Sequence, residues 1–332
     1  MRTIIIAEAG VNHNANIDTA FKLVDVAKDS GADIVKFQTA VPEEVVTKYA
    51  DKADYQKNTN ENETQLEMTK RIHLPLNDFI KINNYCKNKK IQFLTTTFGP
   101  RSTEFIAKLK PALFKIPSGE ITNLPYLRKI SSFKKKIILS TGMSNMDEIA
   151  KAIEVINLCG VKKSDLTVLH CSTEYPANIE NINLRVMQKI KEKFNVDVGY
   201  SDHTLGINIP PIAVAMGAKV IEKHFTLDKN QTGPDHKASL EPFELKEMIL
   251  NIRKIESALG NGIKKPTREE MKNINVVRKS IVAAKKIQKG ETLNEDNITT
   301  KRPGNGISPM LWDEIIGTKA LKNFEKDELI VN

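Results

Sequence analysis

The stretch TIIIAEAGVNHNANIDTAFKLVDVAKDSG, residues 3–31, contains the unit from which most of the chain is built. It opens with an apolar, isoleucine-rich run that is typical of a buried strand. Apolar residues then recur at helical spacing, and a glycine marks the end of the pattern: Ile17, Ala20, Phe21, Val24, Ala27 and then Gly31. The stretch therefore predicts a β-strand followed by an amphipathic α-helix.

Seven further apolar runs repeat this unit. The eight runs are TIIIAEAG, DIVKFQT, IQFLTTTF, LFKIPSGE, KIILSTGM, LTVLHCST, DVGYSDHT and KVIEKHFT, which start near residues 3, 33, 91, 113, 136, 166, 197 and 219. Most of the intervals suit short parallel crossovers. The pattern predicts an α/β protein with a closed (β/α)₈ TIM barrel. A doubly wound open sheet is the alternative, but no glycine-rich phosphate-binding turn follows the first run.

Two departures from the repeat divide the chain. The interval between the second and third runs holds a polar insertion, Pro42–Lys70, and long loops of this kind are usually functional. The helical period stops at about Val277, and the remaining residues have the pattern of a small, mainly β domain. Because 332 residues exceed the roughly 250–300 that one core usually supports, we predict a barrel over 1–265, a linker over 266–277 and a small domain over 278–332.

The composition narrows the classes of function. Apolar residues make up 40% of the chain without any long apolar run, which favours a soluble protein that does not cross a membrane. The first residues lack a signal-peptide pattern, so we expect a cytoplasmic protein. Cys86, Cys159 and Cys171 lack metal-type spacing and are expected to be free thiols. The net charge is +9, but lysines such as Lys87 and Lys134 lie at predicted helix ends and turns, without the aromatic pattern or the recognition motifs of a nucleic-acid binder. We therefore expect a mostly solvated basic surface and small-molecule substrates rather than nucleic acid.

Polar side chains at the ends of the predicted strands form a candidate anion site. Lys36 and Gln38 share one face of the second strand, and Lys115 lies on the fourth. Because barrel active sites lie at the carboxyl ends of the strands, we expect these residues to share a cavity with Thr96, Ser118, Glu120, Ser140, Thr141 and Ser201. Two lysines and several hydroxyls suit a phosphate-bearing carboxylate. The alternatives are a salt bridge for Lys36 and helix capping by the hydroxyls.

Two histidines form a candidate metal site. His203 and His224 stand at the ends of the seventh and eighth strands, beside Asp202 and Glu222. Neighbouring strand ends allow both imidazoles to coordinate one ion, although a lone strand-end histidine is more often an ordinary polar residue. Two imidazoles without a thiolate leave positions for water and substrate oxygens, which favours Mn²⁺ or a similar divalent cation over structural zinc. We expect His73 at the surface and His170 in the core.

Nine motifs in a fixed order cover nearly the whole chain. They are AEAGVNHN, VKFQT, KIPSGE, STGM, TEYP, SDHT, EKHFTLD, GPDHKAS and KRPGNGISP. Together they resemble bacterial sialic acid synthases, that is, N-acetylneuraminate synthases and their legionaminate relatives. The resemblance implies a TIM barrel followed by a small domain similar to type III antifreeze proteins, the SAF domain. It also implies a transferase that condenses phosphoenolpyruvate with the open-chain aldehyde of an N-acylated hexosamine, releasing phosphate by C–O cleavage and forming a nine-carbon 2-keto acid.

The resemblance also implies roles for individual residues. Phosphoenolpyruvate would be bound by Lys36, Thr96, Lys115, Ser118, Ser140 and Ser201, and the sugar by Gln38, Tyr175, Asp235 and Arg302. His203 and His224 would hold the metal, with Mn²⁺ expected and Mg²⁺ or Co²⁺ as alternatives, and Glu8, Glu120 and Glu222 would handle protons. One motif departs from the family, because Ser172 and Thr173 stand where an asparagine is common before the tyrosine. This difference puts in doubt the contact from the sixth strand to phosphoenolpyruvate.

The family resemblance implies a domain-swapped homodimer in which each small domain covers the partner's barrel. The loop KRPGNGISP, residues 301–309, would close the site, with Arg302 directed at the N-acyl group of the partner's sugar. N-acetylmannosamine is the expected acceptor, and 2,4-diacetamido-2,4,6-trideoxymannose, the legionaminate precursor, is the alternative. A metal-dependent amidohydrolase and a sugar-binding or ice-binding protein are further alternatives. The chain lacks the His-x-His motif that such an amidohydrolase usually has after the first strand. Sugar binding alone would not require two lysines and a metal site.

Overall fold

The computed structural model describes residues 2–53, 56 and 63–331. The chain divides into two compact units, residues 1–260 and residues 261–332. Their boundary lies close to the predicted end of the barrel domain. Within the described residues, no helix has the length and apolar character needed to cross a membrane.

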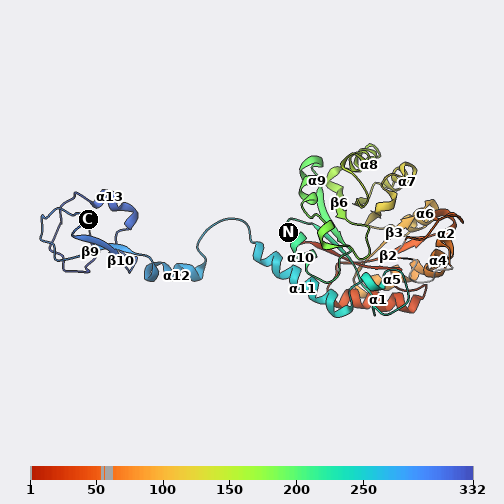
Figure 1. The fold of residues 1–332 in the computed structure, drawn as a ribbon, viewed down its shortest axis with the longest axis horizontal. Helices are drawn as coiled ribbons and strands as arrows, with labels where there is room; N and C mark the ends of the chain where they lie inside the picture. Colours follow the sequence, from red (N-terminus) through yellow and green to blue (C-terminus); the bar gives the residue numbers. More distant parts are fainter. Residues whose placement is uncertain (1, 54–55, 57–62, 332) are drawn as a thin grey trace. The chain divides into compact units, whose positions relative to one another are not determined.

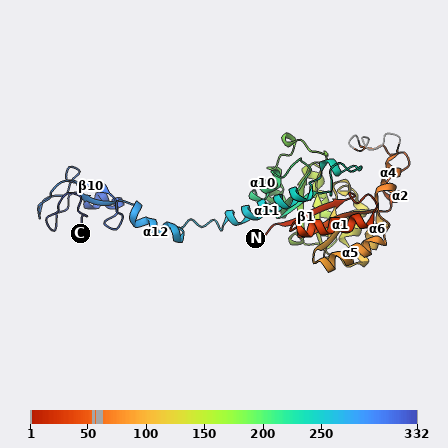
Figure 2. The ribbon, with the colours of Figure 1, turned by 90° about the horizontal axis from the view of Figure 1, so that it is seen from below.

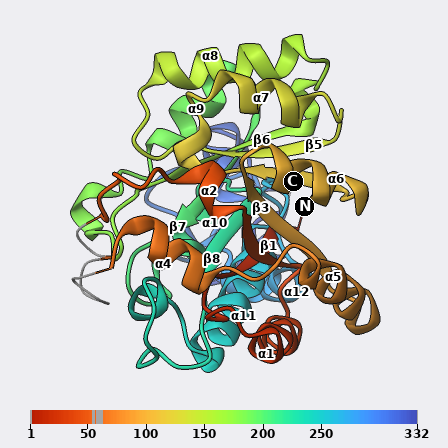
Figure 3. The same ribbon diagram turned by 90° about the vertical axis from the view of Figure 1, so that its right-hand side faces the viewer.

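The first unit is a closed barrel of parallel strands, as the repeating pattern predicts. In the described part of the chain the strands pair in sequence order and β8 returns to β1. The strands are β1 (Ile4–Gly10), β2 (Ile34–Ala40), β3 (Gln92–Phe98), β4 (Leu113–Ile116), β5 (Lys136–Ser140), β6 (Leu166–Cys171), β7 (Asp197–Asp202) and β8 (Val220–His224). Figure 3 shows helices arranged around these strands. The TIM-barrel prediction is confirmed, and the open sheet is excluded.

A helix follows each strand and covers the outside of the barrel. These helices are α1 (Ile17–Asp29), α5 (Asp78–Lys89), α6 (Pro100–Lys108), α7 (Leu124–Ser131), α8 (Met146–Leu158), α9 (Val186–Phe194), α10 (Ile209–Ala215) and α11 (Pro242–Leu259) (Figure 1). Short 3₁₀ helices occupy Ser118–Glu120, Lys163–Asp165, Ile179–Asn181 and His236–Ala238. In α1, the predicted helix, the side chain of Asn16 accepts a hydrogen bond from the backbone N–H of Thr19 and caps the first turn.

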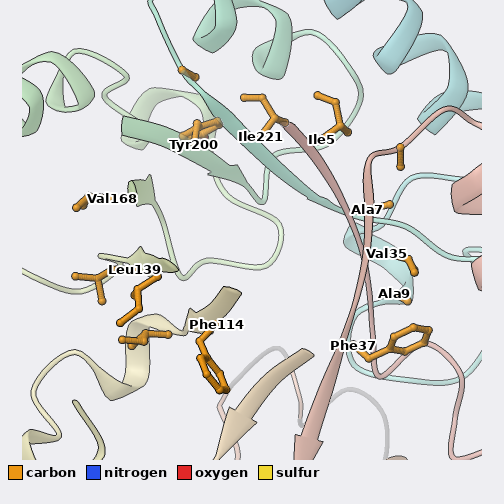
Figure 4. Packing of buried hydrophobic residues seen from close by; sticks show 14 of the residues in the cluster. Ile5, Ala7, Ala9, Val35, Phe37, Phe114, Leu139, Val168, Tyr200 and Ile221 are labelled. Carbon is orange, nitrogen blue, oxygen red and sulfur yellow. The ribbon is translucent and has the colours of Figure 1, made fainter. Parts of the chain in front are cut away.

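The alternation of side chains along each strand produces two apolar cores. Residues such as Ile5, Ala7, Val35 and Phe37 point outward and pack beneath the helices (Figure 4). The intervening residues point into the barrel, where a separate apolar cluster, called here the barrel floor, consists of Ile6, Ile34, Leu94, Leu113, Ile138, Leu169 and Val220. Because side chains alternate with a period of two, the next inward position on each strand lies nearer its carboxyl end.

In its described residues, the polar insertion contains the short helices α2 (Pro42–Val45) and α4 (Gln65–Ile72). They lie next to each other (Figure 2). Thr64 and Glu67 form a reciprocal capping box that fixes the start of α4. Residues 54–55 and 57–62 of the predicted insertion lie outside the described residues. The described part shows that this segment is not simply a loop.

The second unit contains α12 (Arg268–Val277), the antiparallel strands β9 (Ser280–Ala283) and β10 (Ile298–Lys301), a 3₁₀ turn (Pro309–Leu311) and α13 (Trp312–Ile315). The predicted linker over 266–277 is therefore largely helical. A small apolar core stabilises this unit, formed by Ile281, Ala283, Ile287, Leu293, Ile298, Ile315, Ala320, Phe324 and Ile330.

Gly199 in β7 occupies an inward position where the barrel leaves no space for a side chain. A Cβ there would lie 2.5 Å from Leu169 Cδ2 and would also collide with the backbone oxygen of Val220. Because neither neighbouring strand can move freely, Gly199→Ala should destabilise the barrel by about 1–3 kcal/mol in urea unfolding followed by circular dichroism. Gly119→Ala is the control, since a Cβ at that position meets no atom within 4 Å. Equal stability of the two variants would contradict this packing.

Candidate active site

A set of mostly polar side chains lies directly above the barrel floor, at the next inward position of each strand. The set comprises Glu8, Lys36, Thr96, Lys115, Ser140, Cys171, Ser201 and Glu222, and all of them line one cavity of about 490 Å³. Cavities of this size commonly hold small molecules. The structure thus brings together the lysines and hydroxyls of β2 to β5 and β7 that the strand pattern placed in one site. The exception is Thr141, which does not line the cavity and whose Oγ1 donates a 2.8 Å hydrogen bond to the carbonyl of Leu169. Cys171, which the sequence reasoning did not single out, completes the set from β6 and is a free thiol.

Lys36 is the centre of the charged part of the cavity. Its Nζ lies 2.9 Å from Glu8 Oε1 and 3.5 Å from Glu222 Oε1, and it donates a 2.9 Å hydrogen bond to Thr96 Oγ1. Burial alone would lower the pKa of Lys36, but Glu222 and Glu8 outweigh that effect and raise it. Lys36 therefore carries a positive charge, and the salt bridge considered as an alternative is present within the cavity.

The two carboxyl groups beside Lys36 have different proton affinities. Burial raises the pKa of Glu8 to about 7, although Lys36 opposes this. Burial also acts to raise the pKa of Glu222, but Lys115 and Lys36 outweigh it and lower the pKa. Glu222 is thus the ionised partner of the two lysines, whereas Glu8 can gain or lose a proton near neutral pH.

Lys115 provides a second buried ammonium group close to Glu222. Its Nζ donates a 2.7 Å hydrogen bond to Ser140 Oγ and lies 3.8 Å from Glu222 Oε1. Burial lowers the pKa of Lys115, and Glu222 only partly compensates. Ser201 Oγ donates to Glu222 at 3.3 Å. An anionic ligand would find two ammonium groups and several hydroxyls within one polar region.

Two imidazoles lie at the rim of the same cavity. The ring centroids of His203 and His224 are 5.5 Å apart. Burial lowers the pKa of His203 to about 4 and that of His224 well below its usual value, so both rings are neutral. His203 Nδ1 donates a hydrogen bond to the carbonyl of Ser172, which leaves its Nε2 with a lone pair. His224 Nδ1 is buried without a hydrogen-bond partner.

These two histidines fit a divalent cation with few protein ligands. A neutral imidazole is the form that coordinates a metal, and a backbone hydrogen bond that fixes the tautomer is common among such ligands. Within residues 2–53, 56 and 63–331, no three His, Cys, Asp or Glu side chains are arranged to hold a metal together. Any ion held by His203 and His224 would therefore take its other ligands from water or substrate.

Asp202 is not placed to bind a metal ion together with His203 and His224. The sequence reasoning placed it beside the metal, but it alternates with Ser201 and His203 and faces away from the cavity. There it forms a buried 2.6 Å ion pair with Lys223. The alternation of side chains along β7 explains the difference.

Glu120 is the predicted catalytic residue that the structure does not bring into the cavity. It lies in the 3₁₀ turn beyond β4, is absent from the cavity lining, and accepts a 2.6 Å hydrogen bond from Asn123 Nδ2. Ser118 of the same turn does line the cavity, and its Oγ contacts Cys171 Sγ at 3.2 Å. Thr173 also faces the cavity, whereas the carbonyl of Ser172 bonds His203.

The predicted sugar-binding residues of the barrel surround the histidines. Gln38 Nε2 donates to Glu8 at 3.3 Å. The Tyr175 ring lies 4.1 Å from that of His203, measured between centroids, and Asp235 Oδ2 lies 3.8 Å from His224 Nδ1. Burial raises the pKa of Asp235 to about 6. All three residues line the cavity.

Arg302 lies in the second unit, so the prediction that it binds the sugar remains a prediction. Its side chain is exposed, and its Nε donates a 3.0 Å hydrogen bond to the carbonyl of Val277. The loop around it is held within its own unit, since the N–H of Gly304 donates to the carbonyl of Asn275 at 2.8 Å. A Cβ on Gly304 would lie 2.6 Å from Arg278 Cβ, so glycine is needed for this packing.

One side of the cavity is an apolar wall that the sequence reasoning did not identify. It is formed by the buried cluster of Val11, Met68 and Ile72, together with Val45, Val46 and Phe98. Met68 and Ile72 are four residues apart on α4 and therefore share one face of the helix. This four-residue spacing could have predicted the apolar face of the helix from the sequence, but the polar composition of the insertion obscured the pattern.

The remaining histidines are not part of the candidate metal site formed by His203 and His224. His73, expected at the surface, is half-buried and lines the cavity next to α4. His13 and His236 are fully buried. His170 is half-buried and its Nε2 contacts the carbonyl of Ile182 at 2.6 Å, so the expectation of a core position is met only in part.

Comparison with known proteins gives a consistent result over the whole chain. The pattern of the NeuB family matches residues 23–264, and that of the SAF domain matches residues 278–332. The chain is 54% identical to the N,N'-diacetyllegionaminic acid synthase of Campylobacter jejuni, covering 99% of both chains. It is 44% identical to the enzyme of the same name from Legionella pneumophila, covering 97% of this chain and 92% of the relative. The structure resembles that of the N-acetylneuraminic acid synthetase from Leptospira borgpetersenii, with a TM-score of 0.72 and 31% identity over 82% of this chain and 90% of that one.

Proposed function

Since the chain belongs to the NeuB family, the sialic acid synthases, we propose that it condenses phosphoenolpyruvate with 2,4-diacetamido-2,4,6-trideoxymannose to give N,N'-diacetyllegionaminate and phosphate. The observation that supports this proposal most directly is a cavity in which two lysines, two glutamates and two neutral imidazoles lie together, with an apolar wall on one side. The names of the relatives at 54% and 44% identity support the legionaminate precursor, the alternative from sequence, over the expected N-acetylmannosamine.

Phosphoenolpyruvate would lie above the barrel floor. Lys36 and Lys115 offer ammonium groups to its carboxylate and phosphate, and the hydroxyls of Thr96, Ser140 and Ser201 offer hydrogen bonds. These hydroxyls already bond the lysines or Glu222, so the ligand would exchange existing bonds for its own.

His203 and His224 would hold the divalent cation, with Mn²⁺ as the expected ion. When bound, a cation of this kind acts as a Lewis acid that makes the aldehyde carbon more electrophilic. Tyr175 and Asp235 pack around the two imidazoles and would restrict where the sugar can lie. Gln38, which bonds Glu8, would contribute an amide to the same region.

Glu8 and Glu222 would divide the proton transfers of the reaction. Formation of the carbon–carbon bond leaves an alkoxide on the former aldehyde, and addition of water at C2 of the enolpyruvyl unit releases a proton. Glu8, with a pKa of about 7, can donate or accept a proton at neutral pH. Glu222 stays ionised between the lysines and would stabilise the cationic character that develops at C2 before phosphate leaves. Glu120 lies outside the cavity and is not assigned a role.

The apolar wall supports the choice of sugar. The diacetamido sugar has a methyl group at C6 and an acetamido group at C4, whereas N-acetylmannosamine has hydroxyl groups at both positions. The side chains of Val11 and Ile72 have no hydrogen-bonding group, and the thioether of Met68 is only a weak acceptor, so a hydroxyl buried against them would be poorly paired, which is unfavourable. The methyl and acetyl groups would instead bury apolar surface against this wall.

The proposed function is tested by phosphate release from phosphoenolpyruvate with each of the two sugars, in the presence of Mn²⁺ and with or without a chelator. We expect faster, chelator-sensitive turnover of the diacetamido sugar. Faster turnover of N-acetylmannosamine would instead make the protein an N-acetylneuraminate synthase. Lack of turnover with either sugar would contradict both assignments.

Arg302→Ala tests the homodimer in which the small domain contributes to the partner's site. The expected result is a rise in KM for the sugar of about tenfold or more, with KM for phosphoenolpyruvate little changed, because a charge-assisted hydrogen bond contributes roughly 1.5–3 kcal/mol. Lys301→Ala is the matched control, since Lys301 pairs with Asp327 on the same unit. Equal effects of Arg302→Ala on both substrates would contradict the role.

A further inference from the structure

A fully buried ion pair joins the two strands that carry the histidines. Lys223 Nζ lies 2.6 Å from Asp202 Oδ2, and neither side chain is exposed to solvent. Asp202 is the last residue of β7 and immediately precedes His203, and Lys223 immediately precedes His224, the last residue of β8. The two residues are also the last register partners between these strands. The pair thus lies behind both imidazoles, on the outer side of the barrel.

The pair also holds the residue that follows His203. Thr204 donates to Asp202 Oδ1 from its backbone N–H at 3.1 Å and from its Oγ1 at 2.9 Å. Lys223 Nζ donates to the carbonyl of Thr204. His203 is therefore flanked on both sides by residues tied to Lys223, the direct neighbour of His224.

Such a pair is not the simplest way to stabilise a barrel. Removing two charges from water costs free energy that their mutual attraction often fails to recover. Well-packed apolar residues of similar size often give the folded protein the same or greater stability. A directional network has a different property, since it fixes distance and orientation between the segments it joins. The segments joined here are the two that bear the candidate metal ligands.

We propose that Asp202 and Lys223 are positioning residues that set the separation and orientation of His203 and His224 and thereby the affinity for a divalent cation. This inference rests on the proposed function, because it assumes that the two imidazoles bind the ion. Residues behind metal ligands commonly change metal affinity by about 10- to 100-fold. Among the described residues, no third His, Cys, Asp or Glu side chain is arranged to hold the ion together with these two imidazoles, so the ion would be lost more easily if they moved apart.

The test compares Mn²⁺ binding by the full-length protein and its variants, measured from the electron paramagnetic resonance signal of free Mn²⁺. The double variant Asp202→Asn/Lys223→Met removes both charges together and leaves no unpaired buried ion. The matched control is Asp33→Asn/Arg253→Met, which removes a 2.8 Å ion pair near the amino ends of the strands. Thermal unfolding by circular dichroism reports the stability of each protein.

We expect the Asp202/Lys223 variant to bind Mn²⁺ about 10- to 100-fold more weakly than the wild type, and the control to bind like the wild type even if both lose stability. Wild-type affinity in a folded Asp202/Lys223 variant would overturn the inference. If that variant does not fold, the Mn²⁺ affinity of Lys223→Arg tests the inference instead. The larger planar guanidinium cannot occupy the same enclosed space without moving Asp202. Unchanged affinity in Lys223→Arg would then overturn it. A wild type that binds no Mn²⁺ would refute the metal centre itself, a separate result.

Discussion

Replacing Lys36 with methionine should lower kcat/KM for phosphoenolpyruvate by about 100-fold or more. Lys36 lies within 3.5 Å of both Glu8 and Glu222 and also bonds Thr96. Without the ammonium group, the trianionic substrate would have to bind beside these glutamates with Lys115 as the remaining cation. Truncating one partner of a buried charge pair costs roughly 2–5 kcal/mol, and each 1.4 kcal/mol corresponds to about tenfold in affinity.

Steady-state kinetics with varied phosphoenolpyruvate and calorimetric binding of the same ligand would measure this effect. The control is Lys229→Met, because Lys229 forms an ion pair with Glu244 and does not line the cavity. Wild-type binding of phosphoenolpyruvate by folded Lys36→Met protein would show that the substrate lies elsewhere.

Replacing His224 with alanine should reduce Mn²⁺-dependent turnover by about 1,000-fold. It removes one of the two imidazoles, and Lewis-acid stabilisation by a metal contributes several kcal/mol to the transition state, at 1.36 kcal/mol for each factor of ten. The variant should also bind Mn²⁺ more weakly, since His203 would be the remaining imidazole. Its KM for phosphoenolpyruvate should change less than kcat, because the lysines and hydroxyls that would bind this substrate are unaltered.

The measurement is a Mn²⁺ titration of turnover and of binding. His170→Gln is the matched control, because His170 contacts the carbonyl of Ile182 and lies outside the cavity lining. If His224→Ala kept wild-type, chelator-sensitive turnover, the metal ion would have other ligands.

The strand repeat carried much of the structural information. Its spacing predicted the order and number of strands, and the alternation of side chains placed Lys36, Thr96 and Lys115 on the inner face. The same alternation should have placed Asp202 and Lys223 on the outer face, because each adjoins a residue that points inward. Asp202 adjoins His203 in the chain, which suggested a metal ligand and obscured its pairing with Lys223.

Other features could not be read from a strand pattern. Glu120 lies beyond β4 in a 3₁₀ turn, where the alternation no longer determines the direction of a side chain. The apolar wall depends on how α4 packs against Val11, a tertiary contact between segments more than fifty residues apart in sequence. In the function proposed here, the choice between the two acceptor sugars would depend on this wall, whereas the resemblance of the insertion to N-acetylneuraminate synthases favoured N-acetylmannosamine.

The most direct test of the proposed reaction uses phosphoenolpyruvate labelled with ¹⁸O in the bridging C–O–P oxygen, together with 2,4-diacetamido-2,4,6-trideoxymannose and Mn²⁺. Mass spectrometry of both products would follow the label. We predict a nine-carbon 2-keto acid formed together with phosphate that retains the ¹⁸O, because the C–O bond breaks. Unlabelled phosphate without the sugar product would reveal cleavage of the P–O bond and would contradict a condensing enzyme.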